Sequence, residues 1–264
     1  MPKLPGMTTF RELHQSGFFV LPNAWDPASA QLLSAVPGVP AIGTTSAGVA
    51  AALGQPDGER MPLAVMIKAV AAIIEASAVP VTADLEGGYG DIRACIAAAV
   101  DVGAAGVNIE DVRYPDGAIR DAAEAADRIA TARSVSDDLV INARTDVWWS
   151  GSRDFDEGVA RLRRFLQAGA DCVFVPGFPE AQIPELVAAL PGAAINILAS
   201  PTLPYPEVLA AMGVRRVSTG SWLCRLAWGS SRDALAGLLG GQGFAGLATT
   251  LSYPDLMKAL DKRY

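Results

Sequence analysis

Two carboxylates follow an apolar segment near residue 84 and could hold a metal ion. Residues 79–83 predict a buried strand, which ends at Asp84 and Glu86 before the Gly-rich turn 87–90. Residues two apart on a strand point to the same face, so both carboxylates should project together where the strand becomes a loop. Mg²⁺ usually takes one or two carboxylate ligands and keeps several waters. Taken alone, the two acids fit either a metal loop or a solvated turn that caps the next helix.

Charged side chains also end two later strands, and this favours one common site. The strand predicted over 106–111 ends in Glu110 and Asp111, and the strand predicted over 139–146 carries Arg144 near its end. Open α/β sheets and barrels build their sites at the carboxyl ends of parallel strands. Three charged strand ends in succession are hard to explain by solvation, so the sequence predicts a site there.

Strand and helix patterns alternate along the chain and predict the fold that positions these groups. Asp26 and Pro27 have the residue types that begin a helix after the first strand. Alternation implies a parallel sheet, and eight units in about 250 residues predict a (β/α)₈ barrel. A doubly wound open sheet is the alternative. Strands are expected at 18–25, 40–46, 79–86, 106–111, 139–146, 172–176, 193–199 and 214–219. Later helices are expected at 61–77, 91–102, 120–134, 154–169, 179–190, 205–212 and 221–240.

The chain is expected to form one domain over residues 1–264, with 241–264 as a C-terminal helical extension. The net charge of −7 and the lack of a basic run argue against nucleic acid as a partner. No apolar stretch reaches the about 18 residues of a membrane span and no signal peptide is evident, so no membrane partner is expected. Three scattered cysteines argue against a disulfide framework and favour a cytoplasmic location.

The side chains available for catalysis exclude several reaction classes. The single histidine, His14, falls in a predicted N-terminal helix and is expected to be structural, which excludes a His-ligated zinc site. None of the four lysines falls at a strand end, so Schiff-base chemistry is not expected. Cys95, Cys172 and Cys224 are expected in the core. Acids, one arginine and a metal ion remain, and these can hold a carboxylate and stabilise an enolate.

Seven segments, in order, resemble the isocitrate lyase / phosphoenolpyruvate mutase superfamily and together cover nearly the whole chain. They are residues 23–30, Thr45–Gly48, Leu53–Asp57, Asp84–Gly90, Ile109–Asp111, Ala143–Asp146 and Asn196. The resemblance implies a (β/α)₈ barrel and a Mg²⁺ or Mn²⁺ site at Asp84, Glu86 and Glu110, with Asp57 supporting the metal through water. It also implies that substrate is bound by Trp25, Ser46, Ala47, Gly48, Arg144 and Asn196. The amides of 46–48 and the Arg144 guanidinium would hold a substrate carboxylate.

The sequence also departs from the superfamily pattern. Its lyases carry a K-(K/R)-C-G-H loop after the fourth strand, in which the Cys acts as general acid. Here residues 113–120 read RYPDGAIR, without Cys, Lys or His. The Lys and Asn that the phosphonate mutases carry in this loop are absent as well. Residues 175–177 read VPG where many members have a Glu. The chain is therefore similar to a divergent, mutase-like member.

The leading hypothesis is a Mg²⁺-dependent lyase that cleaves a C–C bond in a small 2-oxo or dicarboxylic acid, or its enolate. Cleavage or transfer at a C–P bond and decarboxylation of the oxaloacetate type are alternatives, and so is a non-catalytic barrel that binds a carboxylate. Tyr89 and Tyr114 are candidate proton donors. When the site is empty, Arg144 is expected to pair with Asp146 or Glu110. The resemblance implies that a helix is swapped between neighbouring barrels, in a homodimer or homotetramer.

Overall fold

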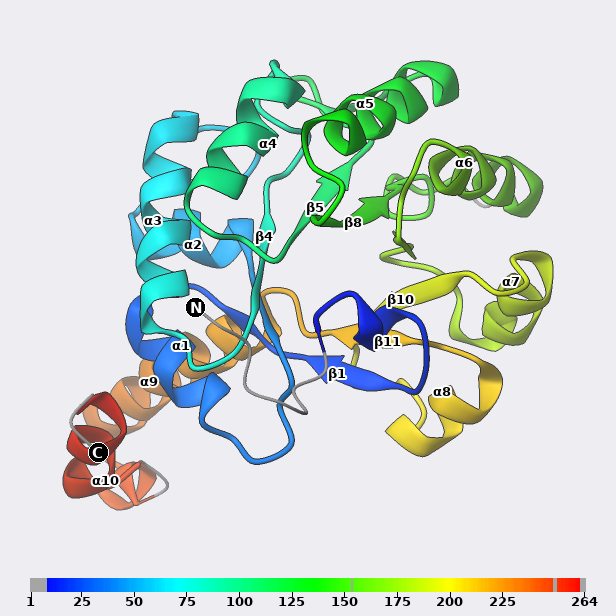
Figure 1. Cartoon of the computed structure of the whole chain (residues 1–264). Helices are drawn as coiled ribbons and strands as arrows, with labels where there is room; N and C mark the ends of the chain where they lie inside the picture. Colours follow the sequence, from blue (N-terminus) through cyan, green and yellow to red (C-terminus); the bar gives the residue numbers. More distant parts are fainter. Residues whose placement is uncertain (1–8, 153, 249–250, 262–264) are drawn as a thin grey trace.

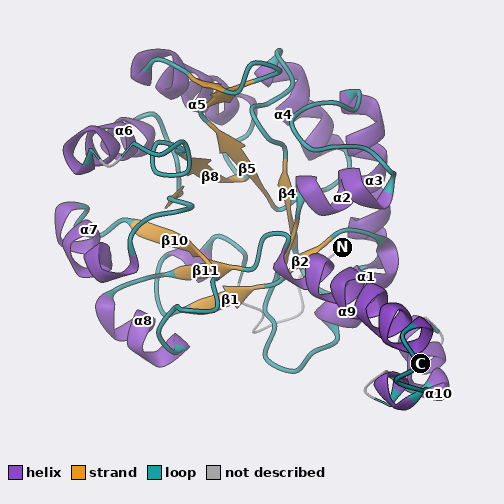
Figure 2. Cartoon of the chain, turned by 180° about the vertical axis from the view of Figure 1, so that it is seen from behind, coloured by secondary structure: helices purple, strands orange, loops and turns teal. Residues whose placement is uncertain are grey.

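Parallel strands form a barrel that is surrounded by helices (Figures 1 and 2). The structure is a computed structural model that describes residues 9–152, 154–248 and 251–261. Within these residues the sheet order is β1-β11-β10-β9-β8-β5-β4-β3-β2. The strands are β1 (Phe19–Leu21), β2 (Asn23–Ala24), β3 (Ile42–Thr44), β4 (Val81–Asp84), β5 (Gly106–Glu110), β8 (Val140–Arg144), β9 (Cys172–Phe174), β10 (Ala194–Leu198) and β11 (Arg216–Ser218).

The barrel closes at the first strand, which Pro22 divides in two. β1 pairs with β11 and β2 pairs with β3, so the two halves of one extended segment join the ends of the sheet. Proline has no N–H to donate to a ladder, which explains the break. The carbonyl of Pro22 still accepts a hydrogen bond from the Gly43 amide. The predicted (β/α)₈ barrel is confirmed, with its first strand split between β1 and β2.

The helices lie outside the strands, as the alternation predicts. They are α1 (Pro27–Ser34), α2 (Ser46–Ala52), α3 (Leu63–Ala76), α4 (Ile92–Asp101), α5 (Ala122–Val135), α6 (Phe155–Gln167), α7 (Ile183–Ala189), α8 (Pro206–Met212), α9 (Trp222–Leu239) and α10 (Tyr253–Leu260). Most of the expected bounds differ from these by one to three residues. The predicted helix 179–190 begins instead as the 3₁₀ turn Glu180–Gln182 and continues as α7.

Two elements near the site differ from the expectation. The strand predicted over 40–46 ends at Thr44, because Thr45 is the N-cap of α2 and its side chain accepts from the Gly48 amide. Residues 113–120, which the sequence leaves as a loop, contain most of a short antiparallel hairpin of β6 (Val112–Arg113) and β7 (Ala118–Ile119). Both elements lie beyond carboxyl ends of strands, where the site is expected.

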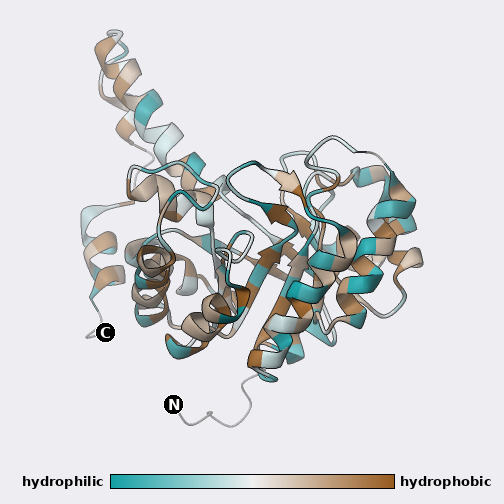
Figure 3. Cartoon of the chain, turned by 90° about the horizontal axis from the view of Figure 1, so that it is seen from above, coloured by the Kyte–Doolittle hydropathy of each residue, from teal (hydrophilic) through white to brown (hydrophobic). Residues whose placement is uncertain are grey.

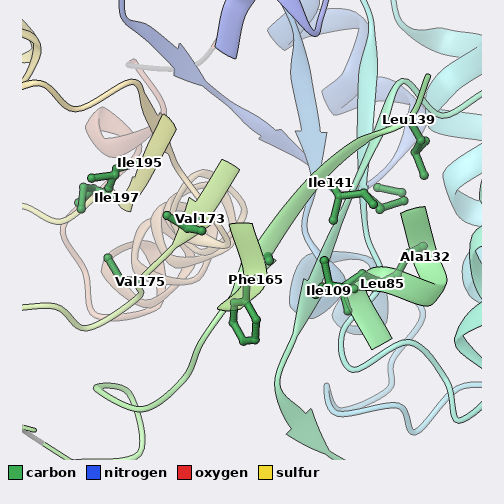
Figure 4. Packing of buried hydrophobic residues seen from close by; sticks show 14 of the residues in the cluster. Leu85, Ile109, Ala132, Leu139, Ile141, Phe165, Val173, Val175, Ile195 and Ile197 are labelled. Atoms are coloured by element: carbon green, nitrogen blue, oxygen red, sulfur yellow. The ribbon is translucent and has the colours of Figure 1, made fainter. Parts of the chain in front are cut away.

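Apolar side chains fill the layer between the barrel and its helices, and Figure 4 shows part of this layer. The inside of the barrel differs, because Asn108, Asn142 and Asn196 are buried in the middle of β5, β8 and β10. The Asn142 Nδ2 atom donates to Asn108 Oδ1 at 2.7 Å. Buried amides need such partners. The structure therefore has an apolar layer outside the barrel and buried amide side chains within it.

The C-terminal helix α9 projects from the barrel (Figures 1 and 3). Within α9, Cys224 is the only buried residue. Large apolar side chains further along are exposed, among them Leu226 (65%), Leu235 (57%) and Leu239 (82%). The predicted extension contains α10, which packs against α1, although residues 249–250 and 262–264 lie outside the described part. None of the described helices combines the length and the hydropathy that a bilayer span requires.

Candidate active site

A cavity of about 440 Å³ lies at the carboxyl ends of the strands. Among the predicted site residues, Ser46, Ala47, Asp57, Asp84 and Arg144 line it. The remaining predicted residues do not line it: Trp25, Gly48, Glu86, Tyr89, Glu110, Tyr114 and Asn196. The structure thus gathers two of the expected metal ligands, the expected guanidinium and part of the expected carboxylate loop around one cavity.

Arg144 ends β8 and is held by two carboxylates. Its Nη1 atom lies 2.9 Å from Glu110 Oε2, and its Nε and Nη2 atoms donate to the two oxygens of Asp146, the latter at 2.7 Å. Both expected partners are therefore present. Burial alone would lower the pKa of Arg144, but these two carboxylates outweigh it and hold the pKa above its ordinary value. The guanidinium is charged, oriented and close to the cavity.

A buried carboxylate fixes the loop that carries Asp146. Asp111 Oδ1 accepts from the Asp146 amide at 2.9 Å, and Asp111 Oδ2 accepts from the Thr145 hydroxyl at 2.6 Å. Arg161 of α6 lies 3.4 Å from the same Oδ2 atom. Asp111, predicted only as part of an acidic strand end, therefore positions the partner of Arg144 and does not line the cavity.

Asp84 ends β4 and faces the cavity with both of its oxygens already hydrogen-bonded. Oδ2 accepts from the Ser46 amide at 2.9 Å, and Oδ1 accepts from Asn108 Nδ2 at 2.9 Å. The Asn142–Asn108 contact extends this chain of donors into the barrel. Ser46 N–H, which the resemblance assigns to the substrate carboxylate, thus donates to Asp84 here. The Gly48 amide donates to Thr45 in the cap of α2.

Glu86 joins the loop after β4 to the loop before α3. Its Oε2 atom accepts from the Glu59 amide, and its Oε1 atom accepts from the Tyr89 hydroxyl at 2.9 Å. Glu59 in turn accepts from the Tyr89 amide at 2.8 Å. All three residues have φ of 52–53°, a region that costs about 1–3 kcal/mol for residues with a Cβ. The contacts between the loops therefore hold a strained turn next to Asp57.

Negative charge accumulates beside the cavity. Burial, and then the charge of Asp57, raises the pKa of Glu86 to about 7. Desolvation and the charge of Asp84 raise the pKa of Asp57. Burial also raises the pKa of Glu110, and the neighbouring Arg144 opposes this. A divalent cation would relieve this repulsion.

Tyr89 and Tyr114, the expected proton donors, each donate to a buried glutamate. The Tyr114 hydroxyl lies 2.6 Å from Glu110 Oε1, just as Tyr89 donates to Glu86. Burial, followed by the charge of its glutamate, raises the pKa of each tyrosine above its ordinary value. A raised pKa makes a phenol a weaker acid. In this structure the two tyrosines hold Glu86 and Glu110 in place.

The donor set fits a hard cation that keeps much of its water. Among the described residues, no three His, Cys, Asp or Glu side chains lie close enough together to hold an ion. Asp57 and Asp84 nevertheless both line the cavity, and every nearby acidic ligand offers oxygen. Mg²⁺ is typically bound by one or two carboxylates plus waters and substrate. The site therefore fits Mg²⁺ and does not fit a metal enclosed entirely by protein ligands.

Sequence reasoning missed several cavity residues, including Thr44, Asn108, Arg216 and Ser218. A signal for one of them, Asn108, is present. Asparagine occurs between apolar residues in VNI, INA and INI, the centres of three different strands. A buried amide in the middle of a strand needs polar partners inside the barrel. Only the third of these, Asn196, is singled out by the sequence.

Comparison with known proteins places this chain in a family. A model of the family described as phosphoenolpyruvate phosphomutase matches residues 10–239. This chain belongs to the isocitrate lyase / phosphoenolpyruvate mutase superfamily. An uncharacterised protein of Mycobacterium tuberculosis is 39% identical over 218 residues, which are 81% of this chain and 82% of that protein. Oxaloacetate decarboxylase 2 of Pseudomonas fluorescens is 29% identical over 219 residues, covering 78% and 72%.

Solved structures agree with this assignment. A protein from Burkholderia cenocepacia J2315, described as a lyase or mutase, superposes with a TM-score of 0.88 at 34% identity, covering 95% of this chain and 93% of the other. Oxaloacetate acetylhydrolase, solved with its product oxalate, gives a TM-score of 0.84 at 26% identity, covering 98% and 94%. Members of this superfamily are lyases, mutases and related hydrolases, and the predicted superfamily is confirmed.

Proposed function

We propose that this superfamily member is a Mg²⁺-dependent enzyme that cleaves a C–C bond in a small 2-oxo acid or its enolate. The observation that carries the proposal is that Arg144, whose guanidinium is paired, lines one cavity together with Asp57 and Asp84. A guanidinium suits a planar carboxylate, and a hard cation suits the oxygens of a 2-oxo acid.

The resemblance implies metal ligands at Asp84, Glu86 and Glu110, with Asp57 acting through water. Because Asp84 and Asp57 line the cavity and the two glutamates do not, we propose instead that Asp84 and Asp57 lie nearest the metal and that Glu86 and Glu110 support it through water. Mg²⁺, or Mn²⁺ in its place, would polarise the 2-oxo group and stabilise an enolate. A phosphonopyruvate hydrolase of the same fold was solved with oxalate and Mg²⁺. The relief of repulsion among the four acids of this chain supports the same role here.

Arg144 would bind the carboxylate next to the 2-oxo group. Because Glu110 and Asp146 already orient the guanidinium, little side-chain entropy would be lost on binding. Among the described residues, no Lys, His or Cys lines the cavity, so protons would be exchanged with water. Chemistry of this kind suits reactions such as decarboxylation or hydrolysis, and oxaloacetate decarboxylase 2 and oxaloacetate acetylhydrolase are among the similar proteins.

A non-catalytic barrel that binds a carboxylate is the second candidate. The observation that favours it is the hairpin β6–β7, where the superfamily's lyases carry their acid-bearing loop. Here Tyr114 occupies that hairpin and donates to Glu110. This candidate keeps the cavity, the metal and the carboxylate site, and predicts binding without turnover.

We also propose that α9 packs against a second copy of the chain, in a homodimer or homotetramer with exchanged helices. The support is the exposure of Trp228, Leu235 and Leu239, which share one face of a helix that projects from the barrel. Monomeric proteins rarely expose contiguous apolar patches of this kind.

Calorimetry with oxalate tests the metal and carboxylate parts of the proposal. Oxalate should bind in the presence of Mg²⁺, and both EDTA and Asp84→Asn should abolish binding. Asp116→Asn is the matched control, because this aspartate is exposed and its partners, Arg113 and the Ala118 amide, both belong to the hairpin. Binding that is unchanged by EDTA and by Asp84→Asn would refute the metal assignment.

A turnover screen then separates the candidate reactions. Oxaloacetate, 2-methylisocitrate, phosphonopyruvate and substituted malates cover C–C cleavage, decarboxylation and C–P chemistry. Turnover of a C–C substrate supports the proposal, and turnover of phosphonopyruvate alone would replace it with C–P chemistry. Oxalate binding without any turnover would favour the non-catalytic barrel.

A further inference from the structure

Arg216 is a buried guanidinium at the cavity that the proposed reaction does not yet use. It is the first residue of β11, it is 2% exposed, and it lines the same cavity as Asp84 and Arg144. Burying a guanidinium is costly unless its charge and its donors are satisfied. The contacts of Arg216 therefore decide whether its charge is already satisfied by the protein.

The contacts leave Arg216 without an ion pair, although the negative charge of Asp84 favours the charged guanidinium. Among the described residues, no carboxylate forms a salt bridge with it, and its buried Nε atom has no hydrogen-bond partner. Its Nη1 atom lies 3.3 Å from His14 Nε2. The other ring nitrogen, His14 Nδ1, lies 2.8 Å from the Phe10 carbonyl and must donate to it. His14 Nε2 is then the acceptor, and the ring is neutral.

The other two arginines at this cavity differ from Arg216. Arg144 is paired with Glu110 and with Asp146. Arg225 is exposed and lies over the ring of Trp222, 4.7 Å from its centroid. Within the described part of the chain, Arg216 is thus the one buried arginine on this cavity wall without an anionic partner.

Polar groups surround Arg216 on the neighbouring strand. Asn196 of β10 is directly opposite it in register, and Asn196 Nδ2 donates to Ser218 Oγ at 3.1 Å. The buried Asn196 Oδ1 atom has no partner. Rotation of this amide by 180° would instead turn its NH₂ group toward the space that Oδ1 now faces, with Ser218 donating to Oδ1. The flipped Asn196 amide would therefore offer a neutral N–H donor on the strand next to Arg216.

We propose that Arg216 binds the far carboxylate of a dicarboxylic 2-oxo acid whose 2-oxo end lies at Arg144 and Asp84. This inference rests on the proposed function and names its substrate class. β8 and β11 are separated in the sheet by β9 and β10, so the two guanidinium groups approach one cavity from different sides. A substrate with a carboxylate at each end would use both, whereas a monocarboxylic acid would leave Arg216 unpaired.

Two matched pairs of ligands test this inference. Oxaloacetate and 2-oxobutanoate have the same chain length and differ only in a carboxylate in place of a methyl group, and 2-oxoglutarate and 2-oxopentanoate differ in the same way. Calorimetry with Mg²⁺ would measure all four, with oxalate as a probe of the Arg144 end alone. At least one dicarboxylate should bind about tenfold or more tightly than its partner, as expected for a charge-assisted pair.

Arg216→Met should remove this preference and leave the affinity for 2-oxobutanoate and oxalate unchanged. Arg215→Met is the matched control, because Arg215 is the adjacent arginine, does not line the cavity and donates to the Gly17 carbonyl. Arg216→Lys keeps the charge and should retain part of the preference. It serves as the second variant if Arg216→Met does not fold.

Each outcome decides the inference. Equal affinity of wild type for both members of both pairs overturns it and means that water alone satisfies Arg216. A loss of oxalate affinity in Arg216→Met equal to the loss of dicarboxylate affinity also overturns it, because Arg216 would then act on the whole site. If wild type binds neither oxalate nor any of the four acids, the proposed function itself fails, and this inference fails with it.

Discussion

Acid should destabilise this protein through its single histidine. His14 is 7% exposed and lies edge-on to Phe10 and Phe19, with ring centroids 4.8 and 5.2 Å away. Burial, and then the positive charge of Arg216, lowers the pKa of His14 from 6.5 to about 3. A protonated ring would lose its acceptor for Arg216 and place two positive charges together.

The direction of this pH dependence follows from proton uptake by the folded and unfolded states. Below pH 6.5 the unfolded chain protonates its histidine, while the folded protein stays neutral at His14 until about pH 3. The unfolded state therefore binds more protons in this window, and stability falls as the pH falls. At 1.36 kcal/mol per pH unit, the two units between pH 6.5 and 4.5 cost about 3 kcal/mol of unfolding free energy.

Urea unfolding at pH 7.5 and 4.5 measures this loss, and His14→Gln provides the reference. Glutamine retains an acceptor for Arg216 but does not titrate. The raised pKa of Glu86 acts in the opposite direction over part of this range, and it contributes equally to both proteins. The difference between the two pH dependences therefore isolates His14. NMR titration of the only histidine signal gives a direct check, and a midpoint near 6.5 in the folded protein would refute the reasoning.

Three further outcomes follow from the site and the exposed helix. Arg144→Lys should weaken oxalate binding about ten- to hundredfold at fixed Mg²⁺, because an ammonium cannot offer two parallel donors; equal calorimetric affinities would mean that the carboxylate lies elsewhere. Replacing Cys95, Cys172 and Cys224 with Ser should leave turnover per folded molecule intact, since burial raises their pKa values to about 12, 11 and 11; activity lost from a folded triple variant contradicts this. Light scattering should give a dimer or tetramer, and a monomer at micromolar concentration would contradict the proposed packing of α9.

The barrel could be predicted from the sequence because each strand is a short apolar run followed by a helical pattern, with Gly or Pro punctuating the sequence between many of them. α2 was missed because its seven residues follow β3 after only Thr45, which continues the apolar and β-branched character of the strand. The hairpin β6–β7 was missed because each of its strands has two residues, too few for any periodicity. These elements depend on tertiary contacts more than on local pattern.

The candidate site, too, could be predicted from the sequence only in part. The sequence could predict that the acids at the strand ends converge, because parallel strands end on one face of a barrel. The sequence could not show which of these acids line the cavity. Glu86 accepts hydrogen bonds from the Glu59 amide and the Tyr89 hydroxyl, and Glu110 accepts one from the Tyr114 hydroxyl. These contacts depend on how the loops fold against one another.

The neighbouring sequence could not identify Arg216 as a cavity residue either. Arg215 and Arg216 are adjacent, and successive residues on a strand face opposite sides. Which of the two enters the barrel depends on the register between β11 and β1, where Arg216 pairs with Phe19. No pattern within residues 214–219 specifies that register, because its partner strand lies at the other end of the chain.

The pairing of β1 with β11, which closes the barrel, determines when the cavity can form during folding. His14 and Arg216 meet across 202 residues of chain, and closing a loop of that length costs about 5 kcal/mol of chain entropy. During synthesis β1 emerges first and cannot pair with β11 until nearly the whole barrel has left the ribosome. The half of the cavity that includes Asp84 and Arg144 can form on the growing sheet. The half that includes Arg216 forms only at closure, after the remainder of the barrel has been synthesised.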